Sequence, residues 1–160
     1  MATDFIASWD LCRGRFDDSI RGMTHEQLNW RLQPNTLTAA ESAIHVAGVE
    51  LWFYGQLMDD LRPEWQRIYD SARAGVIDDR PFPFTPEEMT PEFVMGILDQ
   101  AREIVRPLIE NPSAETLAKE MESALGPIVK GHGALARLAF HPGYHHGQIH
   151  FLMTAPGFPK

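Results

Sequence analysis

Two histidines near the end of the chain, His141 and His145, are four residues apart. They share a predicted helical stripe with Leu138, Ile149 and Leu152. An i, i+4 pair places two imidazole rings one turn apart on one helix face, where both can bind the same metal ion. Ring nitrogens buried in such a stripe without partners would each cost roughly 1–3 kcal/mol. The pair therefore indicates a metal site, with a hydrogen-bonded core histidine as the alternative for either residue.

His45 is a third histidine predicted to face inward, on a helix far away in the sequence. Its neighbours are small and apolar, and Val49 and Trp52 share its face. Three inward histidines from two helices would occupy one face of a metal ion and leave a position open, as catalytic metal sites do. The alternative is that His45 binds a carboxylate or a backbone carbonyl at a helix crossing. The pattern by itself favours neither interpretation.

The other histidines of this last helix, His132, His146 and His150, fall on a different face that is expected to lie nearer to solvent. His146 and His150 also have i, i+4 spacing, so they form a rival chelating pair that the helical geometry disfavours. Pro142 lies between the two favoured ligands and removes a backbone hydrogen bond. A kink at Pro142 would weaken the geometric argument against the rival pair.

Further residues are candidates for the pocket or for contacts with the metal ligands: Trp52, Arg137, Tyr144 and Gln148. Arg137 lies near the ligand face, where it could meet an anionic substrate or form an exposed salt bridge. Gln148 could order a metal-bound water or pair with a neighbouring helix, and aromatic residues in a helical bundle usually belong to the core. Glu50 is expected to face solvent or another helix, so the sequence identifies no general base.

Four long amphipathic helices are predicted to position these side chains, with no convincing strand alternation. The first covers about residues 3–21. The second follows a capping box formed by Thr38 and Glu41 and ends at 58; the third begins at Thr90 and stops at Pro107 and Pro112; the fourth covers about 127–153. This set predicts one all-α domain over residues 1–160, a four-helix bundle. The long connection over 59–89 permits a parallel crossover, which favours an up-down-down-up topology.

Composition excludes several classes of protein. With 14 basic and 22 acidic residues the net charge is -8, and phosphate backbones would repel such a chain, so no nucleic-acid partner is expected. The single cysteine, Cys12, excludes an intramolecular disulfide. No apolar run approaches the ~18 residues of a membrane span. No membrane association and no secretory signal are predicted, and the cytoplasm is the expected location.

Residues 141–149, with the sequence His-Pro-Gly-Tyr-His-His-Gly-Gln-Ile, resemble the last-helix motif of the DinB-like, or DinB/YfiT-like, metalloenzyme superfamily. That motif is H-x-x-x-H, one further residue, and Gly-Gln-Ile or Gly-Gln-Leu. Residues 43–47 resemble the helix-two motif of the family, a single histidine before an apolar-acidic run. The resemblance extends over nearly the whole chain. It implies an up-down-down-up bundle in which His45, His141 and His145 bind zinc, nickel or a similar divalent ion.

The resemblance also implies several activities. The family includes S-transferases that use low-molecular-weight thiols such as bacillithiol or mycothiol, a mycothiol-dependent maleylpyruvate isomerase, and hydrolases. Soft sulfur suits zinc, and the thiolate is the nucleophilic form of a thiol. We therefore expect an enzyme that transfers a low-molecular-weight thiol to a small-molecule substrate. The alternatives are a hydrolase that uses a metal-bound water and a non-catalytic, metal-containing stress or binding protein. The resemblance suggests a homodimer, as do the apolar residues Ile6 and Val94 outside the core stripes.

Overall fold

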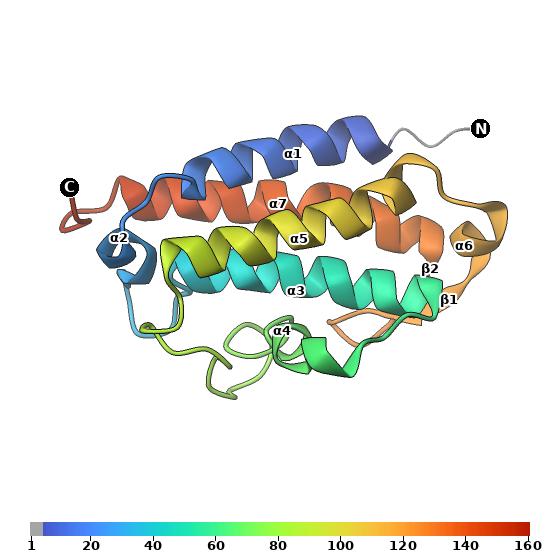
Figure 1. Cartoon of the computed structure of the whole chain (residues 1–160), viewed down its shortest axis with the longest axis horizontal. Helices are drawn as coiled ribbons and strands as arrows, with labels where there is room; N and C mark the ends of the chain where they lie inside the picture. The colour runs from blue at the N-terminus through green and yellow to red at the C-terminus, as the bar shows by residue number, and fades with distance from the viewer. Residues whose placement is uncertain (1–4) are drawn as a thin grey trace.

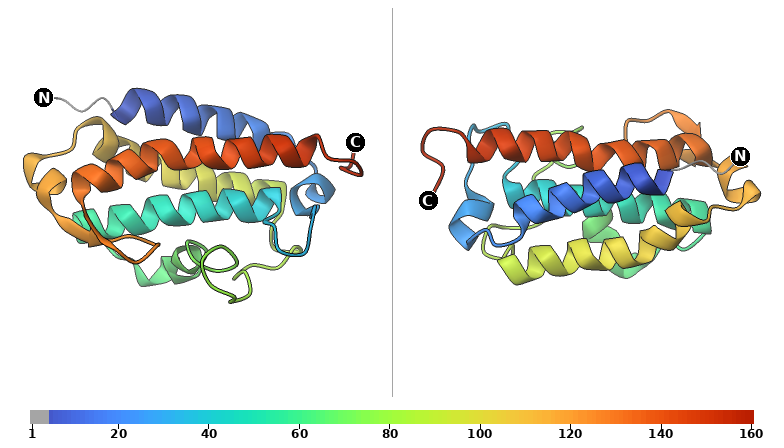
Figure 2. Two further views of the ribbon diagram at one scale, coloured as in Figure 1. Left: turned by 180° about the vertical axis from the view of Figure 1, so that it is seen from behind. Right: turned by 90° about the horizontal axis from the view of Figure 1, so that it is seen from above.

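The computed structural model describes residues 5–160 and is mostly helical, which confirms the predicted helical class. Four long helices lie side by side (Figures 1 and 2): α1 (Phe5–Ile20), α3 (Ala39–Met58), α5 (Pro91–Glu110) and α7 (Gly131–Met153). In Figure 1, α3 and α5 run from left to right, and α1 and α7 run in the opposite direction. Among these four, the most extensive contacts join α1 to α7, α3 to α5 and α3 to α7. The α3–α7 contact matters most here, because it joins the two helices that carry the candidate ligands.

The predicted capping box at the start of α3 is present. The Thr38 hydroxyl accepts a hydrogen bond from the Glu41 backbone N–H at 3.1 Å, and the Glu41 carboxylate accepts one from the Thr38 N–H at 2.8 Å. Thr90 caps α5, with Pro91 in the first helical position. Of the two prolines predicted to end this helix, Pro107 lies inside α5, so that stop is wrong, whereas Pro112 follows closely after the observed end at Glu110. The buried side chains of Leu108 and Ile109 hold this last turn against the core.

Short elements join the long helices. A helical turn, α2 (His25–Asn29), lies between α1 and α3. The long connection after α3 contains η1 (Pro63–Trp65) and α4 (Gln66–Asp70), and α4 packs against α3. The connection after α5 contains α6 (Ala114–Ala118). α1 ends and α3 begins and ends close to the predicted bounds. The predicted start of the first helix at Thr3 lies among residues 1–4, outside the described residues.

The prediction that no strand occurs is wrong. Strands β1 (Glu120–Glu122) and β2 (Ile128–Lys130) form an antiparallel hairpin, with Met121 opposite Val129. Strands this short carry too few residues for alternation to be detected. As a result α7 begins at Gly131 and not at residue 127. A Cβ at Gly131 would lie 1.9 Å from the Thr116 carbonyl oxygen, so only glycine permits this approach of α7 to α6.

The face of α3 opposite the histidines carries a buried charged cluster. Glu50 is fully buried and accepts hydrogen bonds from Trp9 Nε1 at 2.9 Å and Arg13 Nε at 3.1 Å. Arg13 also pairs with Asp17 on α1 and donates to the Leu98 carbonyl of α5 at 2.7 Å. Of the two environments predicted for Glu50, solvent is excluded and contact with another helix is confirmed. The cluster joins three helices, and none of its members lines the histidine site.

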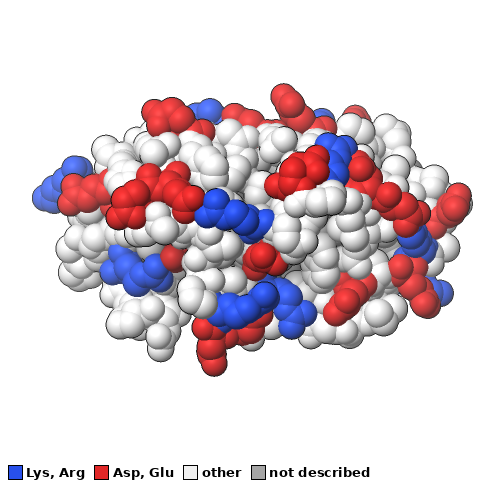
Figure 3. Space-filling model, turned by 60° about the horizontal axis from the view of Figure 1, so that its bottom comes forward, with Lys and Arg blue, Asp and Glu red and all other residues white. Residues whose placement is uncertain are grey.

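The outer surface carries charges of both signs. Figure 3 shows acidic and basic side chains interspersed over one face, without a large field of either sign. Among residues 5–160, no helix combines the length and the apolar character needed to cross a membrane.

α7 is a single helix through Pro142, so the proline does not interrupt the element that carries His141 and His145.

Candidate metal centre

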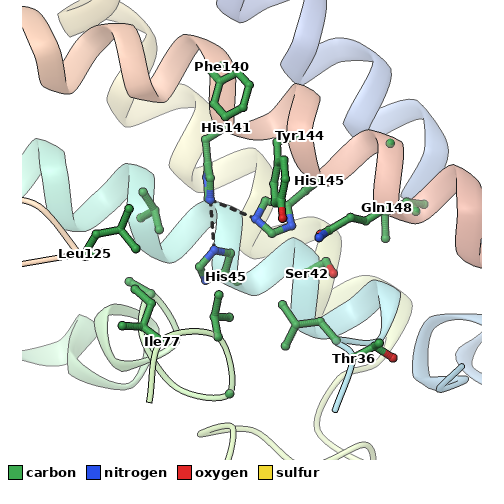
Figure 4. Close-up of a pocket in the computed structure, with 18 of the residues that line it drawn as sticks. Thr36, Ser42, His45, Ile77, Leu125, Phe140, His141, Tyr144, His145 and Gln148 are labelled. Carbon is green, nitrogen blue, oxygen red and sulfur yellow. Dashed lines mark hydrogen bonds between the residues drawn. The ribbon is translucent and has the colours of Figure 1, made fainter. Parts of the chain in front are cut away.

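The three predicted histidines come together between α3 and α7 (Figure 4). The Nε2 atom of His141 lies 3.1 Å from Nε2 of His45 and 3.0 Å from Nε2 of His145. One ligand atom from each ring lies within 4.8 Å of the others, and the group could hold a divalent metal ion. Among the described residues this is the one such group of histidine, cysteine and acidic side chains. The structure therefore brings together the set that the sequence predicted.

The rival histidines of α7 lie elsewhere. His132 and His150 are exposed and His146 is half-buried, whereas His45 and His145 are each only 3% exposed. Because α7 remains one helix through Pro142, the i, i+4 relation of His141 and His145 is preserved and their rings face α3. The predicted placement of His146 and His150 outside the site is confirmed by the geometry.

His45 makes the backbone contact of one interpretation that the sequence left open, and its other ring nitrogen lies where the metal-binding interpretation requires it. Its Nδ1 lies 2.9 Å from the backbone carbonyl oxygen of Ser71, just after α4. A carbonyl can only accept, so Nδ1 carries the proton and Nε2 presents its lone pair to the other two histidines. Such a contact on the outer nitrogen orients a metal-binding histidine and selects its tautomer. Nothing in the sequence singled out Ser71, since a backbone acceptor leaves no residue-type signal.

Gly48 explains how Ser71 comes so close to α3. A Cβ at Gly48 would lie 2.4 Å from both the Ile68 carbonyl oxygen and the Ser71 Oγ atom. The Ser71 Oγ atom lies 3.0 Å from the Ile44 carbonyl oxygen and 2.6 Å from that of Ile68, and its one proton is shared between these two acceptors, which ties the end of α4 to α3. The connection over residues 59–89 thus has a clear role: it carries the carbonyl that orients His45.

Burial keeps the three rings neutral. It lowers the pKa of His45, although the hydrogen bond to Ser71 opposes the shift in part. Burial, followed by the effect of the two neighbouring histidines, lowers the pKa of His141 well below its usual value. Burial and His45 lower the pKa of His145 to about 3, with the Gln148 side chain opposing. Nitrogen lone pairs are therefore available at neutral pH without the loss of a proton.

The donor set fits a borderline divalent ion such as zinc. Two nitrogens bonded to one ion at about 2.0–2.1 Å, at angles between octahedral and tetrahedral values, lie about 2.9–3.4 Å apart. Both measured Nε2 separations fall within that range. Imidazole nitrogen is a ligand that zinc and nickel accept readily. Without an ion, each pair of neighbouring ring nitrogens can share at most one proton. Some nitrogen lone pairs would then face one another.

The histidines open into a cavity of about 1080 Å³. Most of its wall is apolar, and it includes side chains from α3, α7, the hairpin turn and the loop after α4. The predicted pocket residues Arg137, Tyr144 and Gln148 line the cavity, and the Gln148 side chain points toward His145 (Figure 4). Trp52 does not line it, so that prediction is wrong. Phe53, the next residue on α3, does line the cavity, so the two neighbouring aromatic side chains point in different directions from the helix.

The charge of the cavity wall is unusual for an acidic chain. No aspartate or glutamate occurs among its described lining residues, and Arg137 is their only permanently charged side chain. Glu50, which could have served as a base, is buried in the cluster with Trp9 and Arg13. Within the part of the chain that is described, the cavity therefore offers histidine nitrogens, hydroxyls and amides but no carboxylate.

Comparison with known proteins agrees with this site. No curated protein matches the chain. A family model described as the DinB superfamily matches residues 8–149, a range that includes α3, most of α7 and all three histidines. The chain belongs to the DinB superfamily.

Proposed function

We propose that His45, His141 and His145 bind one divalent ion, zinc or nickel, and that the chain is an enzyme that transfers a low-molecular-weight thiol at this ion. The Nε2 atom of His141 lies 3.0–3.1 Å from the Nε2 atoms of the other two histidines, and none of the described residues adds a carboxylate or a thiolate to the group. Three protein ligands leave a coordination position free for a substrate, which is typical of catalytic rather than structural sites.

The observation that carries the proposal is the cavity without a carboxylate. A side-chain base is the usual means of generating a nucleophile, and no acidic residue lines this wall. When bound, a divalent ion would lower the pKa of a coordinated thiol, so the nucleophilic thiolate would exist at neutral pH. A thiol bound in this way would need no carboxylate base, and the same holds for a metal-bound water.

The residues of the chain have distinct tasks in this reaction. The Ser71 carbonyl holds His45 in one tautomer, and the apolar walls limit the access of water to the thiolate. The thiol loses its proton to solvent, its sulfur forms a C–S bond with the second substrate, and the leaving group departs with the electron pair of the broken bond. Tyr144 and Gln148 line the cavity beside the histidines and contact the bound substrates.

The alternative enzyme is a hydrolase, in which water and not a thiol attacks the substrate. A non-catalytic role as a metal-containing stress or binding protein is the third candidate. The size of the cavity favours an enzyme over the non-catalytic role, since about 1080 Å³ is enough for a ligand of drug size. The lack of a lining carboxylate fits either nucleophile, because a bound divalent ion would lower the pKa of water as well as that of a thiol. The thiol is favoured because soft sulfur suits zinc and because most of the cavity wall is apolar.

The test begins with metal analysis of the purified protein and continues with cobalt(II) replacement. Titration with bacillithiol, mycothiol or glutathione should produce a sulfur-to-cobalt charge-transfer band, and thiol transfer to generic electrophiles should follow with the same thiol. If no thiol changes the cobalt spectrum but ester or amide substrates are cleaved, hydrolysis becomes the function.

The helix directions in Figure 1 also support our proposal of an up-down-down-up four-helix bundle.

A further inference from the structure

Arg137 lines the cavity and has no acidic partner among residues 5–160. None of the ion pairs among the described residues includes it, whereas arginines elsewhere, such as Arg62 and Arg106, pair with aspartates. Its guanidinium donates to the Ser123 hydroxyl. Ser123 is 2% exposed, and its oxygen also accepts from the Leu125 backbone N–H at 3.3 Å. This neutral partner holds one arm of the guanidinium but does not compensate its charge.

The chain has an excess of acidic side chains, 22 against 14 basic ones, so an unpaired arginine in a cavity is not explained by a shortage of partners. A half-buried guanidinium loses hydration that a carboxylate would normally replace. Arg137 also retains donors that Ser123 does not use, because a guanidinium has five N–H groups in a fixed fork. The unused charge and the unused donors both face a cavity that is otherwise largely apolar.

Arg137 lies close, along α7, to the histidines at which the proposed reaction takes place. It precedes His141 by four residues on α7, so it lies about one turn, or roughly 6 Å along the axis, from the first α7 ligand. Figure 4 shows Leu125 to the left of the histidines, Phe140 above His141, and Thr36, Ser42 and Gln148 to the right. Arg137 and its partner Ser123 lie where the hairpin turn that carries Leu125 meets α7.

We propose that Arg137 is a substrate-binding residue, and that the second substrate of the transfer reaction carries a carboxylate on an apolar body. The carboxylate binds the guanidinium, the apolar body lies along Phe140 and Leu125, and the electrophilic atom reaches the histidines one turn further along α7. The identity of the reacting group rests on the proposed function; the anion-binding role of Arg137 does not. A planar guanidinium fork matches a carboxylate with two parallel hydrogen bonds, and apolar surroundings strengthen them.

The test measures binding, not turnover. The purified full-length protein, with its metal content determined, is titrated with hexanoate and with hexan-1-ol, which share an apolar chain and differ in charge. Hexanoate should bind more tightly than hexanol to the wild type. Arg137→Gln should weaken hexanoate binding about tenfold or more and leave hexanol unchanged, since a hydrogen-bonded ion pair is lost. Arg15→Gln is the matched control, because Arg15 is exposed on α1 and does not line the cavity.

Three results would overturn the proposal. Equal affinity of the wild type for hexanoate and hexanol, or no binding of hexanoate, would show that the cavity has no anion site. Equal hexanoate affinity in the wild type and Arg137→Gln would show that the carboxylate binds only elsewhere, such as at the metal. Ser123→Ala keeps the guanidinium but removes the hydroxyl to which it donates. If this variant loses as much hexanoate affinity as Arg137→Gln, Arg137 acts by holding the hairpin in place. A cobalt spectrum unresponsive to thiols would overturn the proposed function while leaving an Arg137-dependent hexanoate site in place.

Discussion

At the scale of single residues, the ring contacts separate the three converging histidines from the others of α7. Loss of an outer contact to a metal-binding histidine typically costs 10–100-fold in metal affinity, so loss of the ligand itself should cost at least about 100-fold. We expect this in His45→Ala, His141→Ala and His145→Ala, measured by competition with a chelator. His146→Ala and His150→Ala are the controls and should bind metal like the wild type. Full occupancy in His45→Ala, or metal loss confined to the two controls, would contradict the ligand assignment.

The same three residues predict a pH dependence of stability. Each folded-state pKa is below the ordinary value, so in the metal-free protein the unfolded chain binds protons that the folded chain does not. The free energy of unfolding should therefore be highest above pH 6.5 and should fall as the pH drops below it. The slope should be up to about 1.4 kcal/mol per pH unit for each histidine. Urea unfolding of the metal-free wild type between pH 8 and 5 measures this loss.

A matched variant isolates the contribution of the site to this slope. His145→Gln removes a histidine whose folded-state pKa is lowered to about 3, and should make the dependence between pH 6.5 and 5 shallower. His150→Gln removes an exposed histidine and should leave the slope unchanged. A slope equally shallow in both variants would mean that burial of the site does not cause the acid sensitivity.

At the scale of elements, the close approach of α4 to α3 makes Gly48 a sensitive position. Gly48→Ala should push the Ser71 carbonyl away from His45 Nδ1, because the new Cβ would lie 2.4 Å from the Ser71 hydroxyl and the Ile68 carbonyl. Metal affinity should fall by about 10–100-fold, as for the loss of an outer contact. Gly96→Ala on α5 is the control: nothing lies within 4 Å of its Cβ, and it should stabilise the helix by about 0.5–1 kcal/mol. Unchanged metal affinity in Gly48→Ala would remove Ser71 from its orienting role.

The buried charged cluster is a second test at this scale. Glu50→Ala removes the acceptor of both Trp9 and Arg13, and breaking a buried ion pair from one side typically costs about 3–5 kcal/mol. Glu103→Ala, an exposed change on α5, should alter the free energy of unfolding by less than about 0.5 kcal/mol. Metal content should be unchanged in both, since neither residue lines the cavity. A destabilisation by Glu50→Ala no larger than that by Glu103→Ala would mean that the cluster adds little to stability.

At the scale of the whole molecule, we predict a homodimer. The sequence suggested that Val94 lies outside the core and could contact a partner subunit, but Val94 is fully buried in the core. Large exposed apolar side chains on the neighbouring helices α1 and α7 support the homodimer better, among them Leu11 at 56% and Phe140 at 64% exposure. Light scattering at micromolar concentration should give twice the chain mass of 18.1 kDa. A single 18.1 kDa species would contradict the prediction.

Local rules were sufficient for the parts of this protein that depend on residues near one another. The capping box of Thr38 and Glu41 and the helical spacing of His141 and His145 involve contacts within one turn, so the sequence determines them directly. The inward direction of His45 follows from the apolar stripe on its own helix. These signals, together with the resemblance to a family, were enough to predict the helical class and the three converging histidines.

Tertiary structure decided the rest, because the remaining contacts join residues that are distant in sequence and chemically unremarkable. The carbonyl of Ser71 reaches His45 only because Gly48 lets α4 approach, and a backbone acceptor has no residue-type signal. The sequence allowed Glu50 to face solvent. Only the packing of α1 against α3 shows that Glu50 contacts Trp9 and Arg13. Trp52 shares the helical face of His45 yet lies outside the cavity, whereas its neighbour Phe53 lines it, because the loops and helices that pack around α3 decide where the cavity lies. The cavity, which has no carboxylate among its described lining residues, likewise depends on how α3, α7, the hairpin turn and the neighbouring loops meet.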